Sequence, residues 1–141
     1  MTIELNHTIV NVRDKRASAQ FLTELFALRP AKPFASFLSV QLSNGVTLDF
    51  CDADYAPEPQ HYAFLVSEQE FDEIFARIRS SGIAYWADPA RRQKGEINRH
   101  FGGRGVYFEE PGGHFLEIIT RPYGTGGSRA PKPHPLIAST S

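Results

Sequence analysis

The 141-residue sequence has a single cysteine, and this scarcity limits how the fold can be held together. Cys51 has no partner in the same chain, so no intrachain disulfide can form. A lone thiol is typical of a reducing compartment. A chain of this length buries roughly two-thirds of the surface that it exposes when unfolded, and so needs no disulfide. We therefore expect a cytoplasmic protein that depends on a hydrophobic core.

The sequence also lacks a long apolar run and an excess of either charge. No segment approaches the roughly 20 apolar residues that span a membrane. The N-terminal stretch MTIELNH has neither the basic nor the apolar region of a signal peptide. The 15 basic and 16 acidic residues nearly cancel, so no strong positive field attracts nucleic acid. We expect a small-molecule partner, with no nucleic acid and no membrane.

The first half of the chain predicts a strand, a helix and then further strands. NHTIVNV at 6–12 is rich in β-branched residues, which favour a strand. Asp14 can cap the helix predicted by residues 14–28. Residues 34–42 and 45–51 predict antiparallel strands. The predicted helix has one apolar stripe at helical spacing, formed by Ala17, Phe21, Leu25 and Leu28.

The second half repeats this order. HYAFLV at 61–66 predicts a strand, and SEQE at 67–70 is a capping box for the helix that Gly82 ends. Three further strands follow, within residues 83–88, 104–110 and 114–120. The Pro-rich residues 55–60 separate the two halves. After Tyr123 the composition becomes that of a linker or tail.

The repeated order defines the predicted fold class. It is α+β, with two βαβββ modules that form curved mixed sheets around a cleft. Neither module could bury its sheet alone, so residues 1–123 are expected to form one domain. The first module spans about residues 3–54 and the second about 60–121. Residues 124–141 are expected to be a flexible tail.

The repeat also pairs the residues that could carry chemistry. Superimposing the halves aligns His7 with His61 in the first strand of each module, and the last strands offer Asp49 and Glu117. Because strand side chains alternate, each acid points away from the face that meets the helix. A single strand histidine is usually only hydrogen-bonded. Two imidazoles with one or two carboxylates are sound ligands for a divalent transition metal, so the duplicated pair favours a metal.

Three stretches carry a resemblance to a known family. NHTIVNV, QHYAFLV and GRGVYFEEPGGHFLEI resemble the corresponding segments of the vicinal oxygen chelate superfamily, from residue 3 to about 121. That superfamily includes glyoxalase I, extradiol dioxygenases and the fosfomycin and bleomycin resistance proteins. The resemblance implies that His7, His61 and Glu117 are metal ligands. Asp49 stands where some members have a fourth ligand, and it could bind the metal directly, through water, or not at all.

The resemblance also implies a function. The metal, which could be Zn, Ni, Fe or Mn, would act on a small substrate with two adjacent oxygens. A glyoxalase-like lyase or isomerase is preferred, with Glu117 and Asp49 as catalytic residues. The alternatives are an extradiol-type dioxygenase and a drug-binding resistance protein without catalysis. A homodimer is expected, with the site either inside one chain or shared between two.

Overall fold

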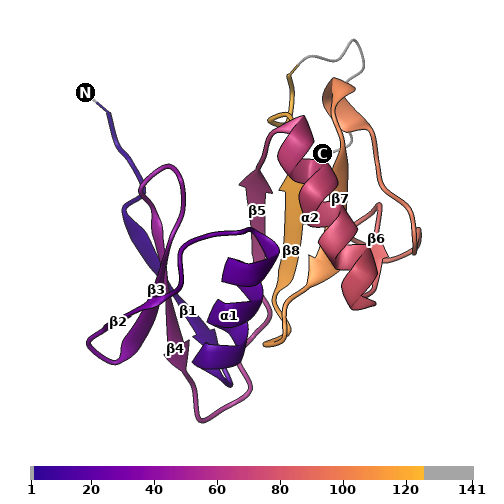
Figure 1. The fold of residues 1–141 in the computed structure, drawn as a ribbon. Helices are drawn as coiled ribbons and strands as arrows, with labels where there is room; N and C mark the ends of the chain where they lie inside the picture. The colour runs from indigo at the N-terminus through magenta and orange to yellow at the C-terminus, as the bar shows by residue number, and fades with distance from the viewer. Residues whose placement is uncertain (1, 126–141) are drawn as a thin grey trace, which may run out of the picture. The chain divides into compact units, whose positions relative to one another are not determined.

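The computed structural model describes residues 2–125, and the order of its elements is the predicted one. Each half has a strand, a helix and three further strands, so the predicted α+β fold with two βαβββ modules is confirmed (Figure 1). The first half contains β1 (His7–Val12), α1 (Lys15–Leu25), β2 (Lys32–Phe34), β3 (Phe37–Gln41) and β4 (Thr47–Asp52). The second contains β5 (His61–Leu65), α2 (Glu68–Ser81), β6 (Tyr85–Trp86), β7 (Gly105–Glu109) and β8 (Phe115–Ile119).

The chain divides into two compact units, each built on one mixed sheet. The strand order is β1-β4-β3-β2 in the first unit and β5-β8-β7-β6 in the second. In each sheet the first and last strands of the module run parallel, and the other pairs are antiparallel. The first unit comprises the chain up to Pro59 together with the turn Glu110–His114, and the second begins at Gln60 and resumes at Phe115.

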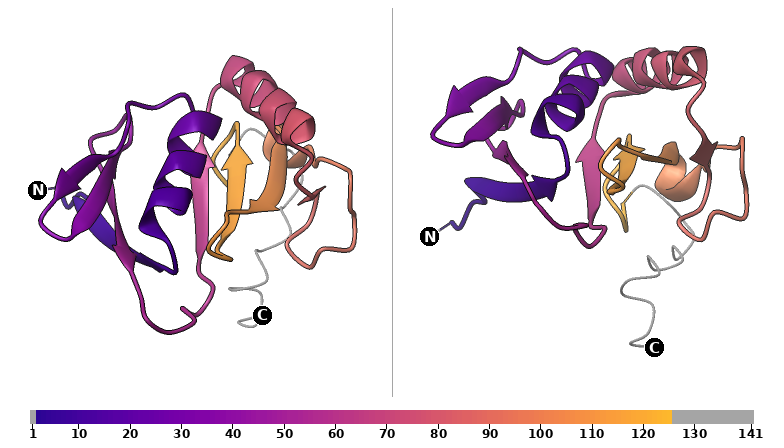
Figure 2. Two further views of the ribbon diagram at one scale, coloured as in Figure 1. Left: turned by 60° about the horizontal axis from the view of Figure 1, so that its bottom comes forward. Right: turned by 90° about the horizontal axis from the view of Figure 1, so that it is seen from below.

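Each sheet is covered by its own helix on one face (Figure 2). Most strand residues that point toward the helices are apolar, and those at the centre of each sheet are almost fully buried. In the first unit they are Val10, Val12, Val40, Leu48 and Phe50, and in the second Val106, Phe108, Leu116 and Ile118. The opposite face of each sheet carries the histidine and the acid of its module beside apolar and aromatic residues.

The first helix differs from its prediction in length and in the face that it buries. It ends at Leu25 rather than at Leu28, because the chain turns at Phe26 and Ala27 takes a positive φ of 52°. The buried residues are Ser18, Ala19, Leu22, Thr23 and Leu25, whereas Ala17 is exposed. The small side chains of Ser18 and Ala19 let the helix lie close to its sheet, so the predicted stripe is wrong at Ala17, although its Leu25 is buried.

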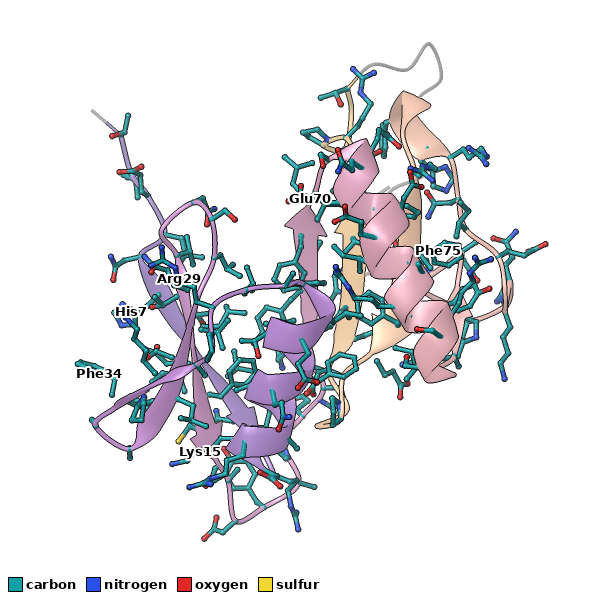
Figure 3. The ribbon with its side chains drawn as sticks, in the orientation of Figure 1. His7, Lys15, Arg29, Phe34, Glu70 and Phe75 are labelled. Atoms are coloured by element: carbon teal, nitrogen blue, oxygen red, sulfur yellow. The ribbon has the colours of Figure 1, made fainter. Side chains whose placement is uncertain are left out.

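The second helix agrees with its prediction. The hydroxyl of Ser67 accepts a hydrogen bond from the Glu70 amide, and the Glu70 carboxylate accepts one from the Ser67 amide. Gly82 ends the helix with a φ of 76°, a left-handed conformation that glycine adopts without strain. Glu70 and Phe75 mark the two halves of this helix in Figure 3.

Two further expectations concern membrane-spanning helices and the C-terminal tail. In residues 2–125, no helix is both long enough and apolar enough to cross a membrane. The tail predicted from residue 124 falls mostly in 126–141, which lie outside the described residues.

Candidate metal centre and active site

The two sheets place one histidine and one acid in the same register. In the first sheet Asp49 is opposite Ile9 on β1, two residues after His7. In the second, Glu117 is opposite Ala63 on β5, two residues after His61. Residues two apart on a strand share a face. Each module therefore carries its histidine diagonally from its acid, on the face away from its helix.

In the second unit this diagonal brings the two side chains together. His61 Nε2 lies 3.1 Å from Glu117 Oε1, and the Glu117 side chain is almost completely buried. Burying a carboxylate without partners costs on the order of several kcal/mol. Glu117 therefore needs hydrogen-bond donors or a cation.

The imidazole of His61 is oriented by the backbone. Its Nδ1 lies 3.0 Å from the carbonyl oxygen of Phe115, which can only accept a hydrogen bond, so Nδ1 carries a proton. In a neutral ring, Nε2 then has a lone pair, and that lone pair faces a carboxylate oxygen. Two acceptors 3.1 Å apart require a proton on one of them or a cation that both atoms bind. The donor set thus fits a divalent metal, and a backbone bond from the other ring nitrogen is the usual way in which ligand histidines are oriented.

Two tyrosines complete the surroundings of Glu117. The Tyr123 hydroxyl donates to Glu117 Oε2 at 2.6 Å, and it lies 3.1 Å from the Tyr107 hydroxyl. Tyr107 is directly opposite Glu117 in the β7–β8 pairing. The rings of His61, Tyr107 and Phe115 also contact one another. The carboxylate therefore lies within an aromatic cluster.

Burial raises the pKa of the Tyr107 phenol well above its ordinary value, and the adjacent charge of Glu117 raises it further. Burial also raises the pKa of Tyr123, and its hydrogen bond to Glu117 adds to that effect. Both phenols therefore keep their protons near neutral pH. Because the folded state holds these protons more tightly than the unfolded state, stability from this source is present below the ordinary tyrosine pKa of about 10 and is lost as pH rises above it.

The first unit holds its two candidates differently. His7 is exposed on β1, on the side of the sheet away from α1, and its Nδ1 lies 2.7 Å from Asn6 Oδ1 (Figure 3). Asp49 is buried and accepts a hydrogen bond of 2.6 Å from the Ser39 hydroxyl on the neighbouring strand. Among residues 2–125, no group of three His, Cys, Asp or Glu side chains is gathered for metal binding. His61 and Glu117 are thus the predicted site residues that the structure brings together, and the triad with His7 stays a prediction.

The family of the chain follows from comparison with known proteins. A model of the Glyoxalase/Bleomycin resistance protein/Dioxygenase superfamily matches residues 4–118. The chain belongs to this superfamily. The resemblance stated from the three sequence stretches is therefore confirmed, and the superfamily contains metal-dependent enzymes that act on small molecules.

Three relatives in the superfamily are informative. The structure of Oxidase ChaP-H2 is 57% identical, with a TM-score of 0.87 over 90% of this chain and 100% of that one. Oxidase ChaP-H1 is 56% identical, with a TM-score of 0.85 over 87% of this chain and 99% of that one. Glutathione transferase FosA from Serratia marcescens is 30% identical in an alignment of 126 residues that covers 84% of this chain and 81% of that protein.

Two further polar residues, Arg104 and His114, have structural partners. Arg104 forms ion pairs of 2.8 Å with Glu68 and with Asp72, and its guanidinium lies over the ring of Phe71. It therefore ties the β7 end of the sheet to the start of α2. The His114 side chain is buried, and its Nε2 lies 2.8 Å from the Asn11 carbonyl oxygen within the first unit.

Sequence reasoning missed the role of Tyr123. The residue comes after the last strand, where composition changes to that of a tail, and no local pattern marks it. The position of its partner Tyr107 can be predicted from the sequence. Tyr107 is opposite Glu117 in the β7–β8 hairpin, and residues opposite each other across a hairpin lie on the same face of the sheet. The contact of Tyr123 depends on how the chain turns after β8.

We predict that Glu117→Gln will lower the pKa of both phenols, because the variant removes the negative charge that favours their protonated form. The decrease should be partial, since burial remains. Alkaline titration of the metal-free protein, followed by tyrosinate absorbance, should show the high-pH component moving to lower pH. Glu109→Gln, at an exposed position on β7, is the control. An unchanged high-pH component in Glu117→Gln would contradict the assignment.

Proposed function

We propose that the protein binds one divalent transition metal per site through His7, His61 and Glu117, and catalyses the oxidation of a small substrate by dioxygen. The substrate would have two adjacent oxygens. The His61–Glu117 pair supports the metal, because its two facing acceptor atoms need a cation or a proton. Identity of 56–57% with two proteins named oxidases supports the oxidation.

Two histidines and one carboxylate suit this chemistry. When bound, the metal supplies a Lewis acid for the substrate oxygens and, as iron in a site of this composition, reactivity with dioxygen. The remaining work belongs to the chain. His61 is fixed by its bond to the Phe115 carbonyl, and Glu117 serves as a ligand. Asp49 is the second catalytic candidate, and its hydrogen bond from Ser39 would keep its carboxylate in one orientation.

A second function is supported by a different observation. Glutathione transferase FosA is 30% identical to this chain over most of both proteins. A lyase, isomerase or thiol-adding enzyme would use the same metal to stabilise a developing oxyanion, without dioxygen. A third outcome is a protein that binds a hydrophobic compound without catalysis. Metal content and dioxygen consumption separate these alternatives.

The first prediction of this proposal concerns metal binding. Purified without a His tag, the protein should bind Fe(II), Mn, Ni or Zn at one ion per site. Glu117→Gln should lose much of this affinity, because a neutral amide is a poorer ligand than a carboxylate. Elemental analysis and calorimetric titration measure both effects, with Glu109→Gln as the matched control. A wild-type protein that binds none of these ions would refute the metal site.

Asp49→Asn distinguishes three roles for the acid of the first module in the same titration. If Asp49 orients a metal ligand through a hydrogen bond, the variant should lose about 10- to 100-fold in metal affinity or activity. If Asp49 is a catalytic base, the variant should keep its metal content while its activity falls. Unchanged metal binding and turnover would remove Asp49 from the site.

The second prediction concerns the reaction. The Fe(II)-loaded protein should consume dioxygen in the presence of aromatic ortho-diols or other compounds with vicinal oxygens, and His61→Ala should not. An oxygen electrode with product analysis by mass spectrometry makes the measurement. Isomerised or glutathione-conjugated product without dioxygen uptake would favour the second function. Tight binding of flat aromatic compounds by a metal-free, inactive protein would favour sequestration.

The third prediction concerns assembly. We propose a homodimer in which His7 of one chain completes the site formed by His61 and Glu117 of the other. Light scattering should give the mass of two chains. Mixed dimers of His7→Ala and His61→Ala should regain metal, because one of their two sites is intact. A monomer, or mixed dimers that bind no more metal than either variant alone, would contradict a shared site.

A further inference from the structure

Tyr123 is held over Glu117 by a turn and by an aromatic partner. The turn follows β8, and both the amide and the hydroxyl of Thr125 donate to the Pro122 carbonyl, at 3.3 and 2.6 Å. The Tyr123 ring stacks on Phe101, with ring centres 5.1 Å apart and planes at 23°. These contacts place the phenol while 41% of the residue stays exposed to solvent. The burial of Glu117 is therefore completed partly by a residue outside the sheet.

The backbone at Phe101 is strained where it supports this ring. Phe101 has a φ of 58°, inside the short helical turn His100–Gly102, although it is not a glycine. A bulky residue adopts this left-handed conformation at a cost, and it persists only when the surroundings fix it. Such strain is concentrated at functional sites. Here the strained residue is the one that stacks on Tyr123.

The hydrogen bonds around Tyr123 have a defined direction. A carboxylate only accepts, so the single hydroxyl proton of Tyr123 is donated to Glu117 Oε2. With its proton used, the Tyr123 oxygen accepts at 3.1 Å from the Tyr107 hydroxyl. Tyr107 also has a hydrogen-bonding interaction with Glu117, so both phenols act on this carboxylate, Tyr123 through the short bond to Oε2. A charge-assisted bond such as the last one is stronger than a bond between neutral groups.

The two oxygens of Glu117 consequently have different surroundings. Oε1 lies beside Nε2 of His61 at 3.1 Å, whereas Oε2 is occupied by Tyr123 at 2.6 Å. A carboxylate without such a bond can offer both oxygens to a metal. With Tyr123 in place, only Oε1 is available to bind a metal together with His61 Nε2.

We propose that Tyr123 is a positioning residue that makes Glu117 a one-oxygen metal ligand, by holding Oε2 away from the metal. The proposal rests on the proposed metal site and extends it to a residue beyond the last strand. The Tyr123 hydroxyl would then set the number of Glu117 oxygens that bind the metal, which a purely structural hydrogen bond would not do. Coordination sites that a two-oxygen carboxylate would fill are thereby left for substrate.

The test uses the full chain and the variant Tyr123→Phe. This variant keeps the ring that stacks on Phe101 and removes only the hydroxyl. The control is Tyr85→Phe, which removes a hydroxyl from a tyrosine whose ring packs edge-on against Phe75. Each protein is titrated with Zn, and its Co(II) form is examined by visible absorption, which weakens as coordination number rises. Thermal unfolding of the metal-free forms verifies that both variants fold.

We expect Tyr123→Phe to bind Zn about 10- to 100-fold more weakly than wild type, the usual loss when a group that orients a ligand is removed. Its Co(II) absorption should also weaken, because the released carboxylate can use both oxygens. Tyr85→Phe should match wild type in both measurements.

Three results would overturn the proposal while leaving the metal site standing. They are an unchanged affinity in Tyr123→Phe, a weaker affinity with an unchanged Co(II) spectrum, and equal losses in both variants. A wild-type protein that binds no metal would instead refute the metal site, and this inference with it. The failure of each idea is therefore recognisable from a different measurement.

Discussion

The burial of one carboxylate, that of Glu117, is the constraint on which the rest of the site depends. A charge placed among apolar strands is unfavourable by several kcal/mol unless donors or cations surround it. Tyr123 supplies a charge-assisted hydrogen bond, which is worth about 1.5–3 kcal/mol. His61, whose orientation is set by the backbone, becomes a second partner through the proton or cation that its Nε2 shares with the carboxylate. These partners hold Glu117 in one orientation, which a ligand or a proton acceptor requires.

Duplication gives the two modules the same register but not the same site. The acid of the first module is paired with Ser39, a short side chain on the adjacent strand. At the corresponding place in the second module, opposite Glu117, stands Tyr107, whose hydroxyl extends to Tyr123. His7 is exposed and bonded to its neighbour Asn6, whereas His61 lies against its acid. The second module thus holds a prearranged pair, and in the proposed triad the first contributes a single histidine.

Sequence patterns predicted the fold because the decisive signals were local. Alternation along 45–51 and 114–120 gave the faces of the last strands, and the Ser67–Glu70 capping box gave the start of α2. The face of α1 was predicted wrongly, because the close packing of Ser18 and Ala19 outweighed the apolar spacing through Ala17. The duplication pointed to His61 and Glu117, which do lie together. Tyr123 could not be predicted, since its contact with Glu117 depends on a turn and on the strained conformation of Phe101 rather than on any repeat.

The turn Glu110–His114 has a consequence for how the chain acquires its structure. It belongs to the first unit, and its His114 side chain is bonded to the carbonyl of Asn11, a residue 103 positions earlier. Contacts between residues so distant in sequence form late and slow folding, because a long loop must close before they contribute. On a ribosome, residues 1–59 emerge well before their last partner has been synthesised. A fragment ending at Pro59 would therefore leave part of its core uncovered, and the first unit becomes complete only when the second has nearly been made.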